Sequence, residues 1–269
     1  MTLFDETPET TGPRGPSVRV RMTVAYDGGA FHGFAVQPNV ETVAGALTLA
    51  IERAMQVKGV ELVCAGRTDR GVHARGQVVS FDVPADTRID TDQLVQRVNR
   101  QLAPRVVARE ASVPESTFDA RYDAKARRYR YSVLNAPVPD PLLSTQAWWV
   151  PQPLNVRSMR AACDPLLGEH DFAAFCRRPT PRRDGRVPGT MRRVIDAEWV
   201  VEGEGMLRFW IEANAFCHQM VRSIVGLLVE VGQGKRKAAD VGELLRAGNR
   251  HGNADPAPAH GLLLWDVRY

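Results

Sequence analysis

The segment from Ala65 to Ala74 holds the residues best suited to chemistry. It reads Ala-Gly-Arg-Thr-Asp-Arg-Gly-Val-His-Ala, and six consecutive residues of it are polar or glycine. It lies between two predicted strands and is longer and more polar than a hairpin of about two to five residues requires. Glycines on both sides allow turns that bring a carboxylate to a cleft. The pattern indicates that Asp69 is presented for chemistry, although turn formation alone would explain Gly66, Asp69 and Gly71 equally well.

A second candidate is an arginine inside an apolar segment. Residues 216–231 predict a helix that is apolar nearly all round and therefore largely buried. His218, Arg222 and Gly226 would share one stripe of that helix. A buried cation costs several kcal/mol unless it is paired and hydrogen-bonded. We therefore expect a carboxylate opposite Arg222, and Asp69 is a good candidate. The alternative is that Arg222 reaches solvent or pairs with a purely structural acid.

Two tyrosines alternate with arginines on one predicted strand. Tyr129 and Tyr131 share one face of it, and Arg128 and Arg130 share the other. An aromatic ring beside arginines suits base stacking next to a phosphate contact. The alternative is that both tyrosines belong to the core, which is the commoner role of tyrosines on a strand.

The cysteine and histidine patterns argue against a metal site. The sequence has no Cys-x-x-Cys motif and no His-x-Glu partner, so a zinc site or a zinc-dependent base deaminase is not indicated. His32 and His73 are expected to be hydrogen-bonded braces without an acid–base role. We expect the four scattered cysteines to be small core residues in a reducing compartment: Cys64, Cys163, Cys176 and Cys217.

Composition places the chain among soluble globular proteins. It has 269 residues, of which 44% are hydrophobic and 25% charged. No apolar run approaches the roughly 20 residues that cross a bilayer. Residues 1–16 lack the basic head and apolar stretch of a secretory signal. We interpret them as a disordered lead-in and expect the protein in the cytoplasm.

The distribution of positive charge is more informative than the net charge of +4. The segment 177–193 (the arginine-rich segment) has seven arginines against one acidic residue, among prolines and glycines. Residues 125–130 and 235–237 form two further basic clusters. Such clusters can be phosphate-binding surfaces. The alternative for each is an ordinary solvated face.

The elements that must position these residues follow the order β-α-β-β-α-β, which is the ferredoxin-like plan. The first unit is predicted as strand 18–26, helix 43–54 with Asn39 as a cap upstream, strands 60–64 and 77–83, helix 94–102 and strand 106–113. The second unit is predicted as strand 122–134, helix 156–167, strands 194–201 and 206–213, helices 216–231 and 238–245, and strand 262–267. We therefore predict an α+β fold of two ferredoxin-like (RRM-like) units with mainly antiparallel sheets, residues 17–113 and 114–269, around a central active-site cleft.

Six ordered blocks of the sequence resemble the TruA-type pseudouridine synthases, over nearly the whole folded chain. The signature loop is matched by Gly66-Arg67-Thr68-Asp69 followed by Gly71-Val72-His73-Ala74. The other blocks are Tyr26-Asp27-Gly28 with Phe31-His32-Gly33, Phe118 with Ala120-Arg121 and Arg128-Tyr129-Arg130-Tyr131, Leu167-Gly168-Glu169-His170-Asp171-Phe172, Asn214-Ala215-Phe216 with His218 and Met220-Val221-Arg222, and Ala257-Pro258-Ala259 with Gly261-Leu262.

The resemblance implies a role for each candidate residue. Asp69 would attack C1′ of the ribose or C6 of uracil, after which the base detaches, rotates and rejoins through C5. Arg222 would pair with Asp69, and Tyr129, but not Tyr131, would stack on the target ring and help manage the C5 proton. Arg67 would hold phosphate or brace the flipped-out nucleotide. The other arginines expected to contact RNA are Arg70, Arg128, Arg182, Arg183 and Arg186.

The resemblance also implies the substrate and the assembly. The chain would be a homodimer that isomerises uridines at positions 38 to 40 in the anticodon arm of tRNA, with no cofactor and no metal. Two alternatives stay open: a pseudouridine synthase acting on another RNA, and a non-catalytic RNA-binding protein of RRM-like folds. The second lacks the aromatic strand signature of an RRM.

The sequence departs from the family pattern at a few positions. Arg70 stands where a small residue is usual, Phe34 and Ala35 stand where Trp and Gln are common, Asp119 replaces a frequent His, and Cys217 replaces a frequent aliphatic residue. These departures bear on RNA contacts and target range and leave Asp69, Tyr129 and Arg222 untouched.

Overall fold

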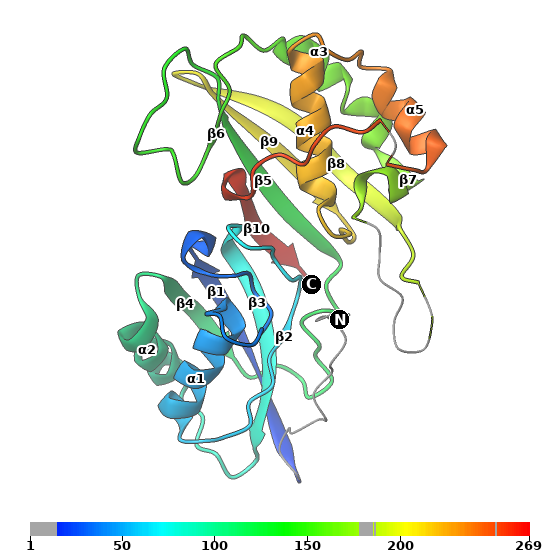
Figure 1. Ribbon diagram of the computed structural model, residues 1–269. Coiled ribbons are helices and arrows are strands. Elements are labelled where there is room, and N and C mark those ends of the chain that lie inside the picture. The colour runs from blue at the N-terminus through cyan, green and yellow to red at the C-terminus, as the bar shows by residue number, and fades with distance from the viewer. Residues whose placement is uncertain (1–14, 178–184, 186, 251) are drawn as a thin grey trace. The chain divides into compact units, whose positions relative to one another are not determined.

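The computed structural model describes residues 15–177, 185, 187–250 and 252–269. That part of the chain has a mixed α+β fold with five α-helices and ten mostly antiparallel strands (Figure 1). Two compact units are present: one holds the chain up to Ala124 together with Leu264–Tyr269, and the other holds Lys125–Leu263. The boundary predicted from sequence lies earlier, after Val113. Most of the predicted lead-in lies outside the described residues.

The first unit is built on an antiparallel sheet with β1 (Ser17–Tyr26) inside it. On one side β1 pairs with β3 (His73–Pro84) and on the other with β4 (Val106–Ser112). The short β2 (Val63–Cys64) also pairs with β3. The last strand, β10 (Leu262–Arg268), neighbours β3. The loop that carries Asp69 therefore joins two paired strands, β2 and β3.

Two helices cover one face of this sheet, α1 (Val43–Met55) and α2 (Thr91–Leu102) (Figure 1). From Val20 to Tyr26 every second residue of β1 is buried, as the alternating pattern predicted. Leu47 and Ile51 of α1 are fully buried as well. Burial of each such side chain stabilises the fold by about 1.5–3 kcal/mol.

The second unit is built on a sheet in the order β5, β9, β8, β7. Neighbouring strands in this order are antiparallel: β5 (Ala126–Leu134), β9 (Met206–Ala213), β8 (Met191–Gly203) and β7 (Gly168–Asp171). A short β6 (Trp148–Trp149) pairs in parallel with β5.

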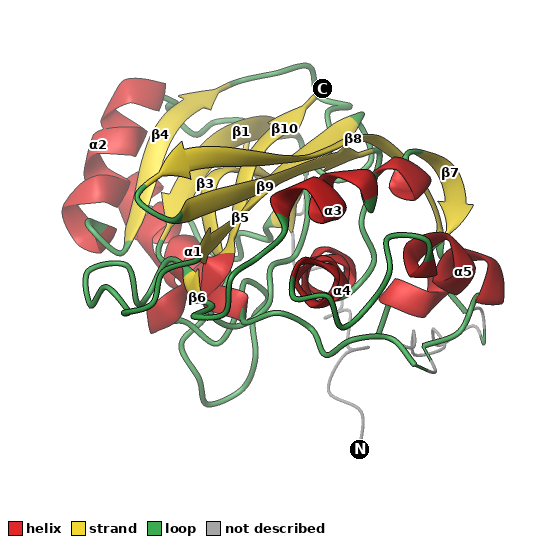
Figure 2. Cartoon of the chain, turned by 90° about the horizontal axis from the view of Figure 1, so that it is seen from above, coloured by secondary structure: helices red, strands yellow, loops and turns green. Residues whose placement is uncertain are grey.

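The helices of the second unit are α3 (Val156–Ala161), α4 (Met220–Gly232) and α5 (Asp240–Ala247). Figure 2 shows all three on the same side of the sheet. Nearly every residue of α4 is buried, as its apolar sequence predicted. Trp199 of β8 and Phe209 of β9 are also buried, and their ring centroids lie 5.1 Å apart.

The structure differs from the predicted elements at several ends. The side chain of Thr42, not Asn39, caps α1 by accepting from the Gly45 backbone nitrogen. The helix predicted over 156–167 ends at Ala161, and a separate 3-10 helix follows at Asp164–Leu166, because Pro165 cannot continue an α-helical hydrogen-bond ladder. Strands β6 and β7 were not predicted from sequence. The ferredoxin-like topology of each unit stays a prediction.

Candidate active site

The loop that carries Asp69 is anchored at Thr68. The buried Thr68 hydroxyl oxygen lies 2.7 Å from the Tyr26 hydroxyl oxygen. The Thr68 carbonyl accepts from the Phe34 backbone nitrogen at 3.0 Å. Two residues earlier, the Gly66 carbonyl accepts from Gln77 Nε2 at 2.6 Å. Contacts from one strand and one turn thus fix Thr68, which immediately precedes Asp69, and a contact from a second strand fixes Gly66.

The block Tyr26-Asp27-Gly28 with Phe31-His32-Gly33, called here the first-strand motif, has two glycines that lie close to the backbone of this loop. A Cβ added to Gly28 would lie only 2.0 Å from the Val72 carbonyl oxygen. Gly33 has a φ of +98°, and a Cβ there would lie 3.2 Å from the Thr68 carbonyl oxygen. The Asp69 carbonyl itself accepts from the Val72 nitrogen at 3.1 Å. The backbone of the motif therefore packs against both sides of Asp69, at a distance that a larger residue at position 28 would not permit.

His73 is a brace, as expected from the sequence. The side chain is largely buried, and its Nδ1 lies 3.0 Å from Asp27 Oδ1 and 3.2 Å from the Gly28 backbone nitrogen. These contacts tie the end of the loop to the first-strand motif. His32 is exposed, and its backbone nitrogen donates to the Glu41 carbonyl at 2.9 Å.

The first unit brings three predicted site residues together on one loop. Asp69 is partly exposed, and Arg67 and Arg70 are exposed on either side of it. Phe34, one of the departures from the family pattern, is buried under this loop, with its ring centroid 6.2 Å from that of Tyr26. The arrangement presents one carboxylate between two cations on a fixed backbone.

The two tyrosines of β5 share the face that the helices cover. Tyr131 is fully buried, and its hydroxyl donates to the Pro258 carbonyl at 2.7 Å. Burial raises the pKa of Tyr131 far above the usual tyrosine range, and the nearby Arg222 cation opposes that rise. Tyr129 is 8% exposed and meets the Phe216 ring edge-on, with centroids 5.0 Å apart. Tyr131 therefore has a structural role, and Tyr129 lies nearer to solvent.

Arg222 lies on α4 and is held by the segment that passes over this helix. Its Nε donates to the Ala257 carbonyl at 2.6 Å, and the Ala257 nitrogen donates to the Arg222 carbonyl at 3.0 Å. The segment approaches so closely that a Cβ on Gly226 would lie 2.1 Å from the Asp255 carbonyl oxygen. The predicted stripe is wrong at His218: α4 begins only at Met220, so His218 precedes the helix.

Arg128 and Arg130 lie on the opposite face of the sheet from the tyrosines. Their guanidinium carbons are 4.7 Å and 5.9 Å from the centroid of the Trp210 ring. Arg127, part of the same basic cluster, is buried and donates to the Asn214 carbonyl at 2.7 Å. This cluster is therefore divided between the two faces of the strand.

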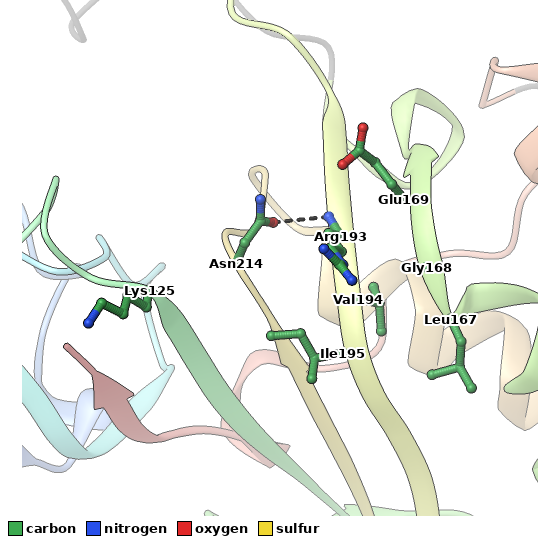
Figure 3. Close-up of a pocket in the computed structure, with 8 residues that line it drawn as sticks. All are labelled: Lys125, Leu167, Gly168, Glu169, Arg193, Val194, Ile195 and Asn214. Atoms are coloured by element: carbon green, nitrogen blue, oxygen red, sulfur yellow. Dashed lines mark hydrogen bonds between the residues drawn. The ribbon is translucent and has the colours of Figure 1, made fainter.

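A groove of about 760 Å³ opens in the second unit at the ends of β5, β7, β8 and β9 (Figure 3). Two exposed cations line it, Lys125 and Arg193, and so do the carboxylate of Glu169 and the amide of Asn214. Asn214 Oδ1 accepts from the Arg193 backbone nitrogen at 3.0 Å, which fixes the course of β8 at the groove.

Two basic regions remain, the arginine-rich segment and the cluster 235–237, and the structure describes only part of the first. Arg182, Arg183 and Arg186 lie outside the described residues. Arg192 is half-buried, and burial lowers the pKa of its guanidinium. In the third basic cluster, Arg236 Nε lies 3.0 Å from Glu230 Oε2. Arg236 thus has a structural partner within its own unit.

The expectation for the cysteines is wrong for one pair. Cys176 and Cys217 form a disulfide, and two cysteines so far apart in the sequence give no spacing signal of a bond. Cys64 and Cys163 are free and buried, as expected. Burial raises the pKa of the Cys64 thiol to about 11 and that of the Cys163 thiol to about 12.

The described residues offer neither a metal-ligand cluster nor a membrane span. Within 15–177, 185, 187–250 and 252–269, no three His, Cys, Asp or Glu side chains gather as metal ligands would. No helix in the described part of the chain has the length and apolar character to cross a membrane.

Sequence reasoning missed the residues that position the loop. Tyr26 lies in a motif that was recognised, but its contact with Thr68 depends on strand pairing. Gln77 is fully buried, and a polar residue within the apolar strand 77–83 was the signal that could have identified it. A buried amide requires a hydrogen-bond partner, and that partner is the backbone of the loop.

The chain is similar to known proteins over most of its length. A family model described as tRNA pseudouridine synthase matches residues 22–123 and 162–269. A tRNA pseudouridine synthase A of Frankia casuarinae is 43% identical over 257 residues, which are 94% of this chain and 89% of that protein. The corresponding protein of Brevibacillus brevis is 40% identical over 254 residues, 93% of this chain and 99% of that protein. Among solved structures, a Cbf5-Nop10-Gar1 complex aligns with 90% of this chain and 47% of that chain at 13% identity and a TM-score of 0.35, which is too low to bear on the fold.

Proposed function

Since the chain belongs to the tRNA pseudouridine synthase family, whose members isomerise uridine to pseudouridine in tRNA, we propose that Asp69 is its nucleophile and that it acts on uridines 38 to 40 of the anticodon arm. The anchoring of the Asp69 loop carries the proposal. The partly exposed Asp69 carboxylate follows Thr68, which is fixed by hydrogen bonds, and the Gly28 backbone packs closely against the Val72 carbonyl of the same loop. Catalysis needs a reacting group held in one geometry, and a simple turn does not.

The proposed reaction conserves all atoms of the substrate. The Asp69 carboxylate attacks C1′ or C6, and the bond between N1 and C1′ breaks. The detached ring rotates, and C5 forms a carbon–carbon bond to C1′. A bond from Asp69 to C1′ breaks in this step, whereas a bond to C6 breaks afterwards by elimination, and either route releases the free carboxylate. C5 then loses its proton, and N1 gains one. A carboxylate needs no separate base to act as a nucleophile, so the step requires neither an oxidant nor a leaving-group activator.

Tyr129 and Arg222 complete the proposed site. Tyr129 stacks on the target ring and helps to manage the C5 proton, while Arg222 pairs with the Asp69 carboxylate. The support for Tyr129 over Tyr131 is that Tyr131 is fully buried and already donates to a backbone carbonyl. The support for Arg222 is that it is a half-buried cation on α4, and a half-buried cation favours a carboxylate as partner.

RNA binding in the proposal depends on cations around the loop and the groove. Arg67 and Arg70 flank Asp69 and are exposed. The arginine-rich segment, with Arg182, Arg183 and Arg186, supplies further phosphate contacts, and so does Arg128. The groove of the second unit adds Lys125 and Arg193. A target uridine must leave its stack to be reached, and such contacts provide the binding energy for that step.

We also propose a homodimer that forms through the helix-free side of the second unit's sheet. Arg130, Trp210 and Glu198 lie in one row across three neighbouring strands, so a cation, an aromatic ring and an anion follow one another. A two-fold axis near Trp210 would set Arg130 against Glu198 of the partner subunit. Such a self-complementary patch suits an isologous contact. Sedimentation of the Trp210→Arg variant tests it: a variant that stays dimeric contradicts this interface.

The decisive experiment for the function maps pseudouridine at single-nucleotide resolution in tRNA treated with the purified protein. Pseudouridine at positions 38 to 40, absent from untreated tRNA, is the expected result. Pseudouridine elsewhere in tRNA would contradict the proposed target. If pseudouridine forms in another RNA and not in tRNA, the result would support the alternative that the enzyme acts on a different RNA.

A further inference from the structure

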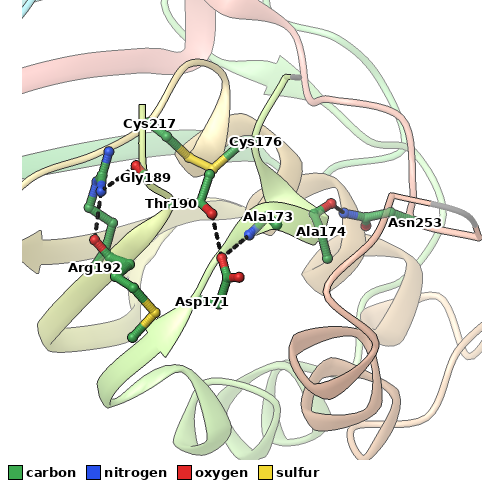
Figure 4. Close-up of a disulfide and its surroundings, with 10 residues drawn as sticks. Asp171, Ala173, Ala174, Cys176, Gly189, Thr190, Arg192, Cys217 and Asn253 are labelled. Carbon is green, nitrogen blue, oxygen red and sulfur yellow. Dashed lines mark hydrogen bonds between the residues drawn. A yellow bond between two sulfur atoms is a disulfide. The ribbon is translucent and has the colours of Figure 1, made fainter. Parts of the chain in front are cut away.

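The disulfide joins two segments that flank proposed functional residues. Cys176 directly precedes the arginine-rich segment, and Cys217 precedes α4, which carries Arg222. The two Cα atoms are 5.6 Å apart, within the ordinary range for a disulfide. The backbone continues the link, because the Arg177 nitrogen donates to the His218 carbonyl at 2.9 Å. The start of the arginine-rich segment is thus covalently tied to the turn that enters α4 (Figure 4).

The far end of the arginine-rich segment is held near the same place by hydrogen bonds. The Phe172 nitrogen donates to the Thr190 carbonyl at 3.1 Å. Asp171 Oδ1 accepts from the Thr190 hydroxyl and, at 3.0 Å, from the Ala173 nitrogen (Figure 4). The two ends of the segment, called here its stems, are therefore both fixed to the fold, one at Cys176 and Arg177 and the other at Thr190. One stem depends on a disulfide, the other on hydrogen bonds.

We propose that Cys176–Cys217 is a reversible thiol–disulfide site, exchanged by dithiols and small disulfides, that controls how tightly the protein binds tRNA by fixing or freeing the described start of the arginine-rich segment at Cys176 and Arg177. This inference rests on the RNA-binding role proposed above for that segment. Disulfides in a reducing compartment are usually transient and regulatory. This one adjoins a segment with seven arginines, so its formation or reduction can change tRNA binding.

The exchange is chemically accessible from one side. Cys217 is half-buried, whereas Cys176 is 1% exposed. An incoming thiolate of the dithiol attacks the Cys217 sulfur, the S–S bond breaks, and Cys176 leaves as a thiolate that takes up a proton. The second thiol of the reductant then attacks the mixed disulfide and releases Cys217. Two electrons and two protons enter the protein, and the dithiol becomes a disulfide. Oxidation by a small disulfide is the reverse.

The other two cysteines cannot replace this pair. Cys64 and Cys163 are buried, and burial raises the pKa of their thiols to about 11 and about 12. Only the thiolate reacts, so at neutral pH these two remain inert in the folded protein. They serve as internal controls for the redox response.

Reduction is expected to weaken tRNA binding. With the disulfide intact, one stem is fixed before RNA arrives. Without it, the stem gains backbone freedom that binding must remove. Ordering one additional residue corresponds to about a tenfold loss of affinity. The reduced protein should therefore bind tRNA about tenfold more weakly, with no change in the pattern of modified uridines.

The test compares one full-length preparation oxidised with glutathione disulfide and reduced with dithiothreitol. Thiols are counted after unfolding, and tRNA affinity and pseudouridine formation are measured in both states. We expect two free thiols in the oxidised protein, Cys64 and Cys163, and tighter tRNA binding in that state. Four thiols after oxidation, or equal affinities with the two states verified, would overturn the proposal. Absence of pseudouridine in both states would instead contradict the proposed function.

Matched variants keep the inference falsifiable. Cys217→Val should bind tRNA like the reduced protein in both conditions, since an aliphatic residue fills the site without bonding. Cys163→Ala, in the same unit, should keep the full redox response. Thr190→Val loosens the other stem, so it should weaken binding equally in both states. A redox response that survives in Cys217→Val would assign the effect to another group and refute the switch.

Discussion

Replacement of Gly28 by alanine tests whether the first-strand motif positions the Asp69 loop. The added Cβ would lie 2.0 Å from the Val72 carbonyl oxygen and 2.5 Å from its carbon. Ordinary contacts are at least about 3.4 Å, so one backbone must move by more than 1 Å. A misplacement of that size can cost about 100-fold in rate. Overpacking of a tight site also costs about 1–3 kcal/mol of stability.

Gly29 supplies the matched control. It belongs to the same 3-10 helix, Gly28–Ala30, and is exposed. A Cβ there would meet only the Asp27 side chain, whose Oδ1 would be 3.1 Å away. Gly29→Ala should therefore retain near wild-type activity.

The assay measures the single-turnover rate of pseudouridine formation, tRNA affinity and thermal unfolding for both variants. Gly28→Ala should lose about 100-fold in rate, and its tRNA affinity should change much less, since most of the proposed phosphate contacts lie outside this loop. If Gly28→Ala equals Gly29→Ala in rate and melting, the close approach at Gly28 does not position Asp69.

Three further predictions concern binding, stability and metal. Replacing Arg182, Arg183 and Arg186 together with alanine should flatten the slope of log affinity against log salt by roughly one unit for each phosphate that is no longer bound; an unchanged slope would make the segment a solvated surface. Tyr131→Phe should cost about 0.5–1.5 kcal/mol in a denaturant titration, since the partly buried Pro258 carbonyl loses its donor, with little effect on the reaction. Activity on folded tRNA should persist in excess EDTA; a loss of activity that zinc restores would contradict a metal-free mechanism.

The periodic elements were predictable from sequence because burial imposes a period on them. The alternation along β1 and the unbroken apolar character of α4 both match the observed burial. Their ends were less predictable. Gln219 adopts a left-handed φ of +65°, so α4 starts after it, although residues 216–219 continue the helical pattern. A single backbone angle of this kind does not change the spacing of apolar residues, so the sequence pattern does not reveal it.

Recognition of the family, made from six short motifs, is confirmed by the family model and the relatives. The same motifs led to Asp69, whose role stays a prediction. What they did not supply was the set of contacts that hold the loop. The bonds from Tyr26 and Gln77 join two strands to the loop that carries Asp69, and the Cys176–Cys217 bond joins two distant segments. These partners become neighbours only through the folded sheets, and no spacing along one chain reveals them.

The most direct test of the proposed mechanism measures pseudouridine formation by the Asp69→Asn protein. Asparagine keeps the size and suits a turn equally well, but it removes the nucleophile. Melting must be checked first, because removal of the carboxylate proposed to pair with the half-buried Arg222 is expected to lower stability. For a folded variant, we predict isomerisation at background level with tRNA affinity little changed, since phosphate contacts dominate binding. A folded Asp69→Asn protein that forms pseudouridine at a near wild-type rate would contradict the assignment of Asp69 as the nucleophile.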